Sequence, residues 1–341
     1  MQNYNELKRK ITSEPKRWLI TGVAGFIGSN LLEVLLKLNQ NVVGLDNLST
    51  GSINNLNEVN SLVSDSQWKN FKFVNGDIRN YDNCEIACED INYVLHQAAL
   101  GSVPRSLKDP ISTNENNIDG FLNILMAARR EGVDSFTYAS SSSVYGDNNK
   151  LPKLEKNIGK PLSPYALTKY VNELYASNFE RVFGFSSTGL RYFNIFGPRQ
   201  DPMGSYAAVI PKWATCMIKN KEVVINGDGK TSRDFCFIEN AVQANILAAT
   251  SNSNKKNRIF NIAVSQRTSL LDLFSIIKSS LLNHGIDYRK KPLFDSFREG
   301  DVRHSHADIS NAVSELGYNP SDDIKSGISK SMSWYINNFC D

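Results

Sequence analysis

The sequence predicts an α/β protein built on a doubly wound, mostly parallel sheet. Two observations carry this prediction. Short apolar runs alternate with longer amphipathic stretches along the first half of the chain, which is typical of repeated β-α-β units. A glycine-rich turn directly follows the first apolar run and precedes a helical pattern, as in sheets that bind a dinucleotide. We therefore expect a Rossmann fold.

The expected elements follow one another in a regular order. The first strand is Trp18–Ile20, and the first helix runs from Phe26 to Leu38. Further strands are expected at five short apolar runs, and helices at two longer amphipathic stretches. The strands are Val42–Leu45, Phe71–Val74, Tyr93–Leu95, Phe136–Ala139 and Thr188–Leu190, and the helices are Phe121–Arg130 and Tyr170–Phe183.

The pattern changes beyond Asn194. Turns such as Gly227–Gly229 become frequent, and helical patterns dominate from Leu270 onward. This change predicts a dinucleotide-binding domain followed by a smaller α/β substrate lobe interleaved with it. The first domain is expected over 16–193, with 234–263 returning to it, the lobe over 194–233 and 264–341, and an N-terminal helical extension over 1–15.

Composition and charge argue against several classes of protein. The 341 residues are 41% hydrophobic and 21% charged, which is ordinary for a globular chain. A net charge of +3 is too small to indicate a nucleic-acid- or membrane-binding surface. No apolar run approaches the ~20 residues of a membrane-spanning helix, and residues 1–14 lack the apolar core of a secretory signal. Five cysteines without a CxxC pair favour neither disulfides nor a zinc site. We expect a cytoplasmic protein without a metal.

The turn over residues 21–28 is the candidate cofactor site. Gly22 permits a tight turn, Gly25 lets the backbone approach a pyrophosphate, and Gly28 lets helix and strand pack closely. The following helix offers free N–H groups to the phosphates. The next strand ends in Asp46, whose carboxylate can accept hydrogen bonds from ribose hydroxyls and would repel a 2′-phosphate. The sequence therefore predicts NAD rather than NADP.

Tyr165 and Lys169 are a candidate proton-transfer pair. Four residues apart, they share one face of a helix that Pro164 is suited to begin. A tyrosine with an ordinary pKa of about 10 is a poor base at neutral pH, and a nearby cation together with the positive nicotinamide ring would lower that pKa. The serine run 140–143 stands at the end of the fifth strand, where ligands bind in parallel sheets.

The motifs together resemble the extended branch of the short-chain dehydrogenase/reductase family. The resemblance rests on the GxxGxxG spacing of 22–28, on 76–78 (Gly-Asp-Ile), on 96–99 (His-Gln-Ala-Ala) and on Tyr165-x-x-x-Lys169. It implies that Asp77 and its neighbour meet the adenine and that Lys169 hydrogen-bonds the nicotinamide ribose. The implied NAD site is Gly22, Gly25, Phe26, Ile27, Gly28, Asp46, Asn47, Gly51, Asp77, Ile78, Gln97, Tyr165 and Lys169.

The same resemblance narrows the reaction. It implies that Tyr165 is the base, with Lys169 beside it, and that Ser141 bridges Tyr165 and the reacting sugar oxygen. Related 4,6-dehydratases carry Asp-Glu at 142–143, because elimination of water needs an acid and a base. Related decarboxylases carry Glu at 143, and deoxysugar epimerase-reductases carry Cys there. Two serines leave oxidation and reduction at one carbon, which with a retained cofactor is 4-epimerisation.

The segment 191–198 resembles the family's loop into the substrate lobe, where Asn194 meets the sugar diphosphate. Forked arginine donors suit diphosphate oxygens, and 298–301 (Arg-Glu-Gly-Asp) matches the family's diphosphate-arginine and ribose-aspartate motif. The implied UDP-sugar site is Ser102, Ser141, Ser142, Ser143, Tyr165, Asn194, Val209, Asn226, Arg233, Arg267, Arg298, Asp301 and Ser305.

Ser305 bears on the identity of the sugar. It stands where epimerases restricted to plain hexoses carry a tyrosine, and a small residue there leaves room for an N-acetyl group. Nearly the whole chain resembles bacterial UDP-N-acetylglucosamine 4-epimerases of O-antigen or capsule biosynthesis. The corresponding uronate and the UDP-glucose/UDP-galactose pair stay open as substrates, with Arg105 or His304 as candidates to meet a carboxylate.

Two other classes stay open on this fold. One is a regulator that senses the dinucleotide, although such proteins usually lack the Tyr–Lys pair. The other is a net dehydrogenase or reductase that exchanges its cofactor in each turnover. The resemblance also implies a homodimer through helices near 116–130 and 165–179.

Overall fold

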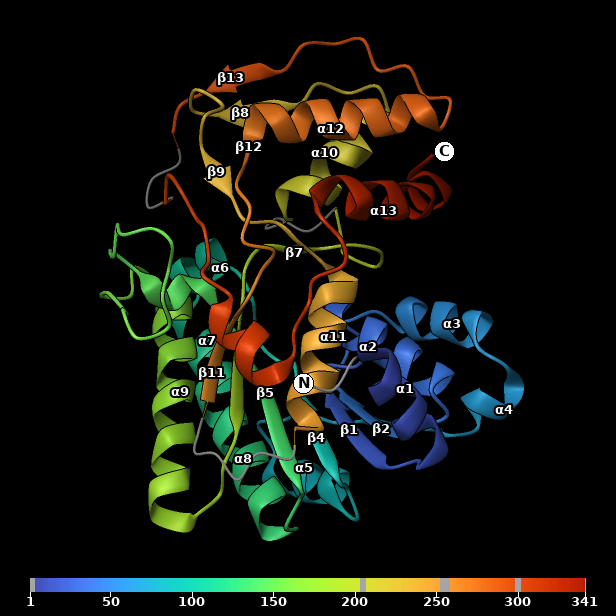
Figure 1. Ribbon diagram of the computed structural model, residues 1–341, viewed down its shortest axis with the longest axis vertical. Helices are drawn as coiled ribbons and strands as arrows, with labels where there is room; N and C mark the ends of the chain where they lie inside the picture. Colours follow the sequence, from blue (N-terminus) through green and yellow to red (C-terminus); the bar gives the residue numbers. More distant parts are fainter. Residues whose placement is uncertain (1–3, 203–206, 252–257, 298–301, 341) are drawn as a thin grey trace.

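A seven-stranded parallel sheet forms the centre of the molecule (Figure 1). The computed structural model describes residues 4–202, 207–251, 258–297 and 302–340. All six strand pairings are parallel, and the strand order is β11-β6-β5-β4-β1-β2-β3. The strands are β1 Arg17–Thr21, β2 Asn41–Asp46, β3 Phe71–Asn75, β4 Tyr93–His96, β5 Ser135–Ser141, β6 Thr188–Tyr192 and β11 Arg258–Ile262. The predicted doubly wound parallel sheet is therefore confirmed.

Helices cover both faces of the sheet, so its central strands are apolar on both sides. Along β1, Trp18 and Ile20 join one core and Leu19 joins the other. The first core includes residues of α2 Phe26–Lys37, α3 Ile53–Leu62 and α11 Ile238–Ala249. The second core includes residues of α5 Tyr81–Cys88, α8 Gly120–Arg130 and α9 Pro164–Phe183.

Short elements connect these layers. They are α4 Asp65–Trp68, α6 Val103–Lys108, α7 Pro110–Asn114, the π-helical turn η1 Glu115–Asp119 and the 3-10 turn η2 Ser142–Tyr145. The N-terminal helix α1 Tyr4–Ser13 buries Leu7 and Ile11 against the first core.

A smaller group of elements gathers in the upper part of the molecule in Figure 1. They pair as short two-stranded sheets flanked by helices. The strands are β7 Ile195–Phe196 with β10 Cys236–Phe237, β9 Ser232–Arg233 with β12 Thr268–Ser269, and β8 Val224–Asn226 with β13 Leu293–Asp295. The helices of this group are α10 Val209–Ile218, α12 Leu270–Asn283 and α13 Ile324–Phe339. The π-helical turn η3 Ala312–Leu316 lies instead beside α11 and β11.

The segment 234–263, expected to return to the first domain, contains α11 and β11. β11 pairs with β6 at the edge of the large sheet, and α11 packs on the face that α2 also covers. The chain thus crosses between the large sheet and the upper elements more than once.

Helix α9 carries the Tyr–Lys pair and has well-defined ends. Ser163 caps its first turn by accepting a hydrogen bond from the Ala166 N–H at 3.2 Å, and Pro164 opens the helix, as the sequence predicts. Gly184 ends it in a left-handed conformation with φ +67°. Both ends are local signals, and they place Tyr165 in the first turn.

Candidate functional site

A cavity of about 320 Å³ opens where β1, β2, β3 and β4 end. In parallel sheets, ligands bind at this edge where the strand order reverses, here between β1 and β4. The loops after all four strands contribute to the wall. Ten of the thirteen predicted cofactor residues line it, namely Gly22, Gly25, Phe26, Ile27, Gly28, Asp46, Asn47, Gly51, Ile78 and Gln97.

The glycine turn fits a dinucleotide. A Cβ on Gly28 would lie 2.1 Å from the Gly22 carbonyl oxygen, so this position requires glycine for packing alone. A Cβ on Gly25 would meet only that same oxygen, at 3.2 Å, within the described protein. Gly25 also caps α2 without a side-chain hydrogen bond. The N–H groups of the first turn of α2 therefore suit a pyrophosphate at this wall.

Asp46 lies at the end of β2 with its carboxylate facing the glycine turn. One oxygen accepts a hydrogen bond from the Ala24 N–H at 2.9 Å, and the other accepts from the Leu48 N–H at 2.8 Å. Burial raises the pKa of Asp46 despite these two bonds. Each oxygen keeps a second acceptor position, so the carboxylate can still bind ribose hydroxyls.

Asp77 stands beside this cavity rather than in its wall. Its carboxylate pairs with Arg79 at 2.7 Å and accepts a hydrogen bond from Asn47 at 2.9 Å. The hydrogen bonds from Arg79 are the main cause of a pKa of about 2 for Asp77. Asn47 does line the cavity. Asp77 therefore reaches the cavity through Asn47, a partnership that the sequence analysis missed.

Lys169 is buried on α9, and its ammonium donates to the Ala139 carbonyl oxygen at 2.9 Å. This contact places it at the carboxyl end of β5. Burial lowers the pKa of Lys169 to about 8. An ammonium with this pKa can lose its proton near neutral pH.

The Tyr165 hydroxyl hydrogen-bonds to the Ser141 side chain. Burial raises the pKa of Tyr165, and the bond to Ser141 lowers it only in part. The expected lowering of the tyrosine pKa, which also depends on the charge of the nicotinamide ring, stays a prediction. Desolvation outweighs any effect of Lys169, whose own charge is disfavoured by the same burial.

The serine run folds back on itself after β5. The Ser141 hydroxyl accepts hydrogen bonds from the Ser143 N–H at 3.1 Å and from the Ser143 hydroxyl at 2.9 Å. These bonds begin η2 and leave Ser142 and Ser143 partly exposed. The structure thus brings Ser141, Ser143 and Tyr165 together.

A buried network that the sequence analysis missed holds this arrangement. Glu173 lies one turn after Lys169 on α9 and accepts a hydrogen bond from the Ser140 hydroxyl at 2.6 Å. Arg191 of β6 binds both carboxylate oxygens of Glu173, at 2.9 and 2.7 Å. Arg191 also donates to the Tyr145 hydroxyl at 3.0 Å. The only sequence signal was the spacing of four residues, which places Glu173 on the Lys169 face of α9.

Asn117 is a second residue that the sequence analysis missed. Its side chain accepts a hydrogen bond from the Leu100 N–H at 2.8 Å and donates to the Leu100 carbonyl oxygen at 3.1 Å. The same amide donates to the Thr168 hydroxyl at 3.1 Å. Leu100 lines the cofactor cavity, and Thr168 precedes Lys169. Asn117 therefore connects the cavity wall to the helix that carries the Tyr–Lys pair.

A second cavity of about 460 Å³ lies among the upper elements. Four predicted substrate residues line it: Asn194, Val209, Asn226 and Arg233. Lys212, Trp213 and Asp295 line it as well and were not predicted. Trp213 follows Val209 by four residues on α10, so the helical period was the signal that could have found it.

The remaining predicted substrate residues are more scattered. The backbone N–H of Ser305 donates to the Ser232 carbonyl oxygen at 3.0 Å, and the Arg267 guanidinium donates to the Ser232 hydroxyl at 3.2 Å. Both therefore stand next to Arg233 without lining the second cavity. Ser102 caps α6 in the loop after β4, with φ +104°. Arg298 and Asp301 lie outside the described residues.

Two further searches gave negative results over the described ranges. No helix there is long and apolar enough to cross a membrane. Likewise, no cluster of three or more His, Cys, Asp or Glu residues in this part of the chain could hold a metal ion.

The comparisons with known proteins agree on one family. Residues 18–263 match the model of the NAD dependent epimerase/dehydratase family. The chain is 40% identical over 322 residues to a putative UDP-glucose 4-epimerase of Methanocaldococcus jannaschii, covering 94% of this chain and 98% of the relative. It resembles the structure of a UDP-N-acetylglucosamine 4-epimerase from Methanobrevibacter ruminantium, solved with UDP-N-acetylmuramic acid. That match has a TM-score of 0.86 and 36% identity, covering 95% and 99% of the two chains.

A third similar protein has a different sugar in its name. It is the UDP-glucuronic acid 4-epimerase from Bacillus cereus, solved with UDP-glucuronic acid and NAD. The TM-score is 0.83 at 29% identity, and the match covers 95% of this chain and all of the other. The similar proteins thus share NAD or UDP-sugars but differ in the sugar itself.

Replacing Lys169 by methionine should stabilise the ligand-free protein below pH 8, because the folded state no longer buries an ammonium. The folded pKa of about 8 lies below the ordinary value of 10.5, so the unfolded chain binds more protons between these values. Wild-type stability therefore rises with pH in this window, by up to about 3 kcal/mol. The difference in Tm between Lys169→Met and wild type should be largest below pH 8 and shrink as the pH rises. Calorimetry measures it, with the exposed Lys156→Met as control; a pH-independent difference would contradict the burial argument.

Proposed function

Because the chain belongs to the NAD-dependent epimerase/dehydratase family, within the extended short-chain dehydrogenases/reductases, we propose that it is a UDP-sugar 4-epimerase. NAD is its cofactor. The hydrogen bond between Tyr165 and Ser141 carries the proposal. It places a proton acceptor beside a serine run that contains no carboxylate to drive elimination.

The proposed reaction oxidises C4 of the sugar to a ketone and then reduces it from the opposite face. Tyr165 takes the C4 hydroxyl proton, directly or through Ser141, and returns it in the second half-reaction. Lys169, with its pKa of about 8, can exchange a proton with the site at neutral pH. When bound, NAD supplies the hydride acceptor and donor and a positive charge that favours the phenolate of Tyr165.

The nucleotide end of the substrate is proposed to bind in the second cavity. Arg233 and Lys212 supply cationic groups for a diphosphate there, and Asn194 supplies an amide in the same wall. The sugar end faces Ser141, Ser142 and Ser143, whose small side chains leave it room to turn. A firmly held nucleotide and a loosely held sugar are both needed, because the 4-keto sugar has to present its other face.

We further propose UDP-N-acetylglucosamine and UDP-N-acetylgalactosamine as the substrate pair, in the synthesis of polysaccharide precursors. The small side chain of Ser305 and the likeness to the Methanobrevibacter ruminantium structure support this choice. The uronate is the alternative favoured by the Bacillus cereus likeness, and UDP-glucose by the Methanocaldococcus jannaschii relative.

Incubating the purified protein separately with UDP-GlcNAc, UDP-Glc and the UDP-GlcNAc uronate should give the C4 epimer fastest from UDP-GlcNAc. No added cofactor should be needed, because NAD is retained between the two hydride transfers. Chromatography of the nucleotide sugars resolves the epimers. Accumulation of NADH with added NAD would instead indicate a net dehydrogenase, and no conversion of any of the three would contradict the proposed function.

Replacing Tyr165 by phenylalanine should abolish this interconversion, because phenylalanine has no hydroxyl to take and return the C4 proton. The rate of epimerisation should fall by at least about a hundredfold, which is the usual contribution of a general base. Bound NAD, measured on the purified variant, should be unchanged. Tyr170→Phe, on the same helix, is the matched control and should keep its activity. Retained turnover in Tyr165→Phe would exclude the assigned role.

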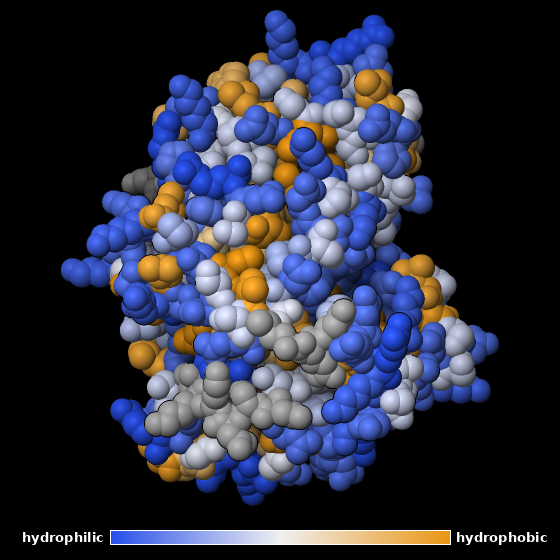
Figure 2. All heavy atoms as spheres, viewed as in Figure 1, coloured by the Kyte–Doolittle hydropathy of each residue, from blue (hydrophilic) through white to orange (hydrophobic). Residues whose placement is uncertain are grey.

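We also propose a homodimer through α9 and the helices beside it. Leu167 and Leu174 lie seven residues apart on α9, and each is 51% exposed. Ile111 on α7, which packs beside α9, is 71% exposed. Elsewhere, Figure 2 shows hydrophobic residues in small separate groups among hydrophilic ones on the viewed face. An exposed apolar row along one helix supports an interface there.

Replacing Leu174 by glutamate should convert the proposed dimer to a monomer, because the charge would be buried in the interface. Light scattering after size-exclusion chromatography measures the mass. The matched control is Leu282→Glu on α12, a leucine that is 59% exposed but lies away from α9. A wild-type monomer, or an unchanged Leu174→Glu dimer, would contradict this interface.

A further inference from the structure

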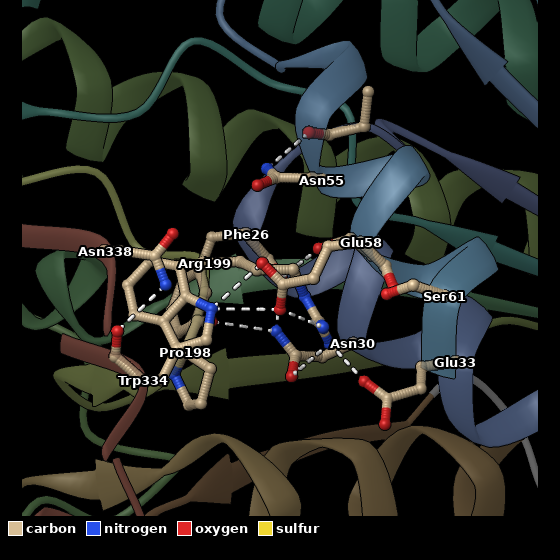
Figure 3. Close-up of polar contacts among 12 residues, drawn as sticks. Phe26, Asn30, Glu33, Asn55, Glu58, Ser61, Pro198, Arg199, Trp334 and Asn338 are labelled. Atoms are coloured by element: carbon tan, nitrogen blue, oxygen red, sulfur yellow. Dashed lines mark hydrogen bonds and ion pairs between the residues drawn. The ribbon is translucent and has the colours of Figure 1, made fainter. Parts of the chain in front are cut away.

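Arg199 forms the centre of a polar cluster that joins α2, α3 and the loop after β7 (Figure 3). It lies in the loop after β7, and its residue is 4% exposed. Its guanidinium binds Glu33 of α2 at 2.6 Å and Glu58 of α3 at 3.0 Å. It also donates to the side-chain oxygen of Asn30 on α2 at 2.9 Å. One side chain thus joins two helices of the cofactor domain.

The loop around Arg199 is held at three successive residues. The Gly197 carbonyl accepts a hydrogen bond from Tyr335 of α13 at 3.2 Å. The Pro198 carbonyl accepts one from Asn30 at 3.2 Å. Arg199 itself has φ +67°, which is unfavourable for a residue with a side chain. Such a backbone persists only where the surroundings hold it, as these contacts do.

Helix α13 adds a second contact to the same cluster. The Trp334 indole N–H points at the Glu58 carboxylate and lies 2.9 Å from each of its oxygens. Figure 3 shows Glu58 between the Trp334 ring and the Arg199 guanidinium. Trp334 and Tyr335 are adjacent, so two neighbouring residues of α13 bind α3 and the Arg199 loop.

Arg199 joins α2, which lines the cofactor cavity, to α3, which directly follows a segment that lines it. Phe26, Ile27 and Gly28, in the first turn of α2, line that cavity. The wall residues 47–51 lead directly into α3, whose cap residue Ser52 donates its N–H to the Ala24 carbonyl at 3.0 Å. Asn55 donates to the same carbonyl at 2.9 Å. On its N-terminal side the Arg199 loop follows β7, and Asn194, the residue before β7, lines the second cavity.

The charges of the cluster explain why it depends on Arg199. Burial acts to raise the pKa of Glu33, but hydrogen bonds and charges of Lys37 and Arg199 outweigh it and lower that pKa. Glu58 faces the same guanidinium from α3. Without Arg199, two carboxylates on adjacent helices would face each other in a largely dry space. Their repulsion would act directly to separate α2 from α3.

We propose that Arg199 is a positioning residue that sets how long the enzyme retains NAD. It holds α2 and α3 together, and with them the glycine turn and the 47–51 segment on either side of the cofactor cavity. The inference rests on the proposed function in one respect: a 4-epimerase has to keep the same cofactor through both hydride transfers. Arg199 touches neither cavity, so its effect reaches the cofactor only through the two helices.

The test measures release of NADH from the protein without any UDP-sugar. The wild type and variants are loaded with NADH, and the loss of bound-NADH fluorescence is followed after addition of excess NAD. Arg199→Met should release NADH at least about ten times faster than wild type, and Arg199→Lys, which keeps the charge, should fall between them. Lys37→Met is the matched control, because it removes the other partner of Glu33 without touching the loop, and it should release NADH at the wild-type rate.

Two variants that perturb the cluster less than Arg199→Met can be tested even if Arg199→Met does not fold. Glu58→Gln weakens the contacts of Arg199 and Trp334 with α3, and Trp334→Phe removes only the contact of α13 with Glu58. Both leave the guanidinium its bonds to Glu33 and Asn30, so both should release NADH several times faster. Wild-type release rates in Arg199→Lys, Glu58→Gln and Trp334→Phe would overturn the inference, whatever their Tm. A lowered Tm with unchanged release would show a purely structural role. If the wild-type protein converts none of the UDP-sugars, the proposed epimerase activity is contradicted. The NADH release rates would still test the role of Arg199.

Discussion

The arrangement of the proposed active site depends on one buried ion pair, between Arg191 and Glu173. Both side chains are almost fully buried, at 1% and 3% exposure, so each charge has lost its water. Such a pair is stable only when the geometry is good and the remaining hydrogen-bonding positions are filled. Here the contact is bidentate, and Ser140 and Tyr145 fill further positions. The pair therefore fixes α9 against β5 and β6 in one register. Because Tyr165 and Lys169 are on that helix, the same register sets where they meet Ser141.

The fold was predictable from local patterns, and much of the cofactor cavity came with it. Strands that are apolar on both faces and a glycine turn at the first of them determine the sheet and its binding edge. The features that the motifs did not show have a common physical cause. The pairing of Glu173 with Arg191 joins α9 to β6. Burial raises the pKa of Tyr165 in the protein alone. Both depend on three-dimensional packing, which no motif contains.

Arg199 shows this limit most clearly. Its partners Glu33 and Glu58 lie 166 and 141 residues earlier in the chain, and nothing in the local sequence marks it as buried. The glycine before it is easier to explain, because a Cβ on Gly197 would lie 2.4 Å from the Ile238 side chain. A short loop packed against α2, α3 and α11 thus contains one residue required for space and one required for charge. Only the folded structure separates these two requirements.

The crossings between the large sheet and the upper elements explain how the two cavities can act together. The chain leaves the sheet after β6 near Asn194, returns near Asp234 and leaves again after β11. The Asp234 carboxylate joins these crossings, because it accepts hydrogen bonds from the N–H of Val264 at 3.1 Å and of Ala307 at 3.2 Å. Burial raises its pKa to about 6, so it stays ionised and holds both bonds at neutral pH. Asp234 and Arg199 thus each fasten segments outside the large sheet to the elements that pack on it. In the proposed complex the cofactor and the nucleotide are therefore held firmly. Only the sugar between them, beside the small serine side chains, is free to turn.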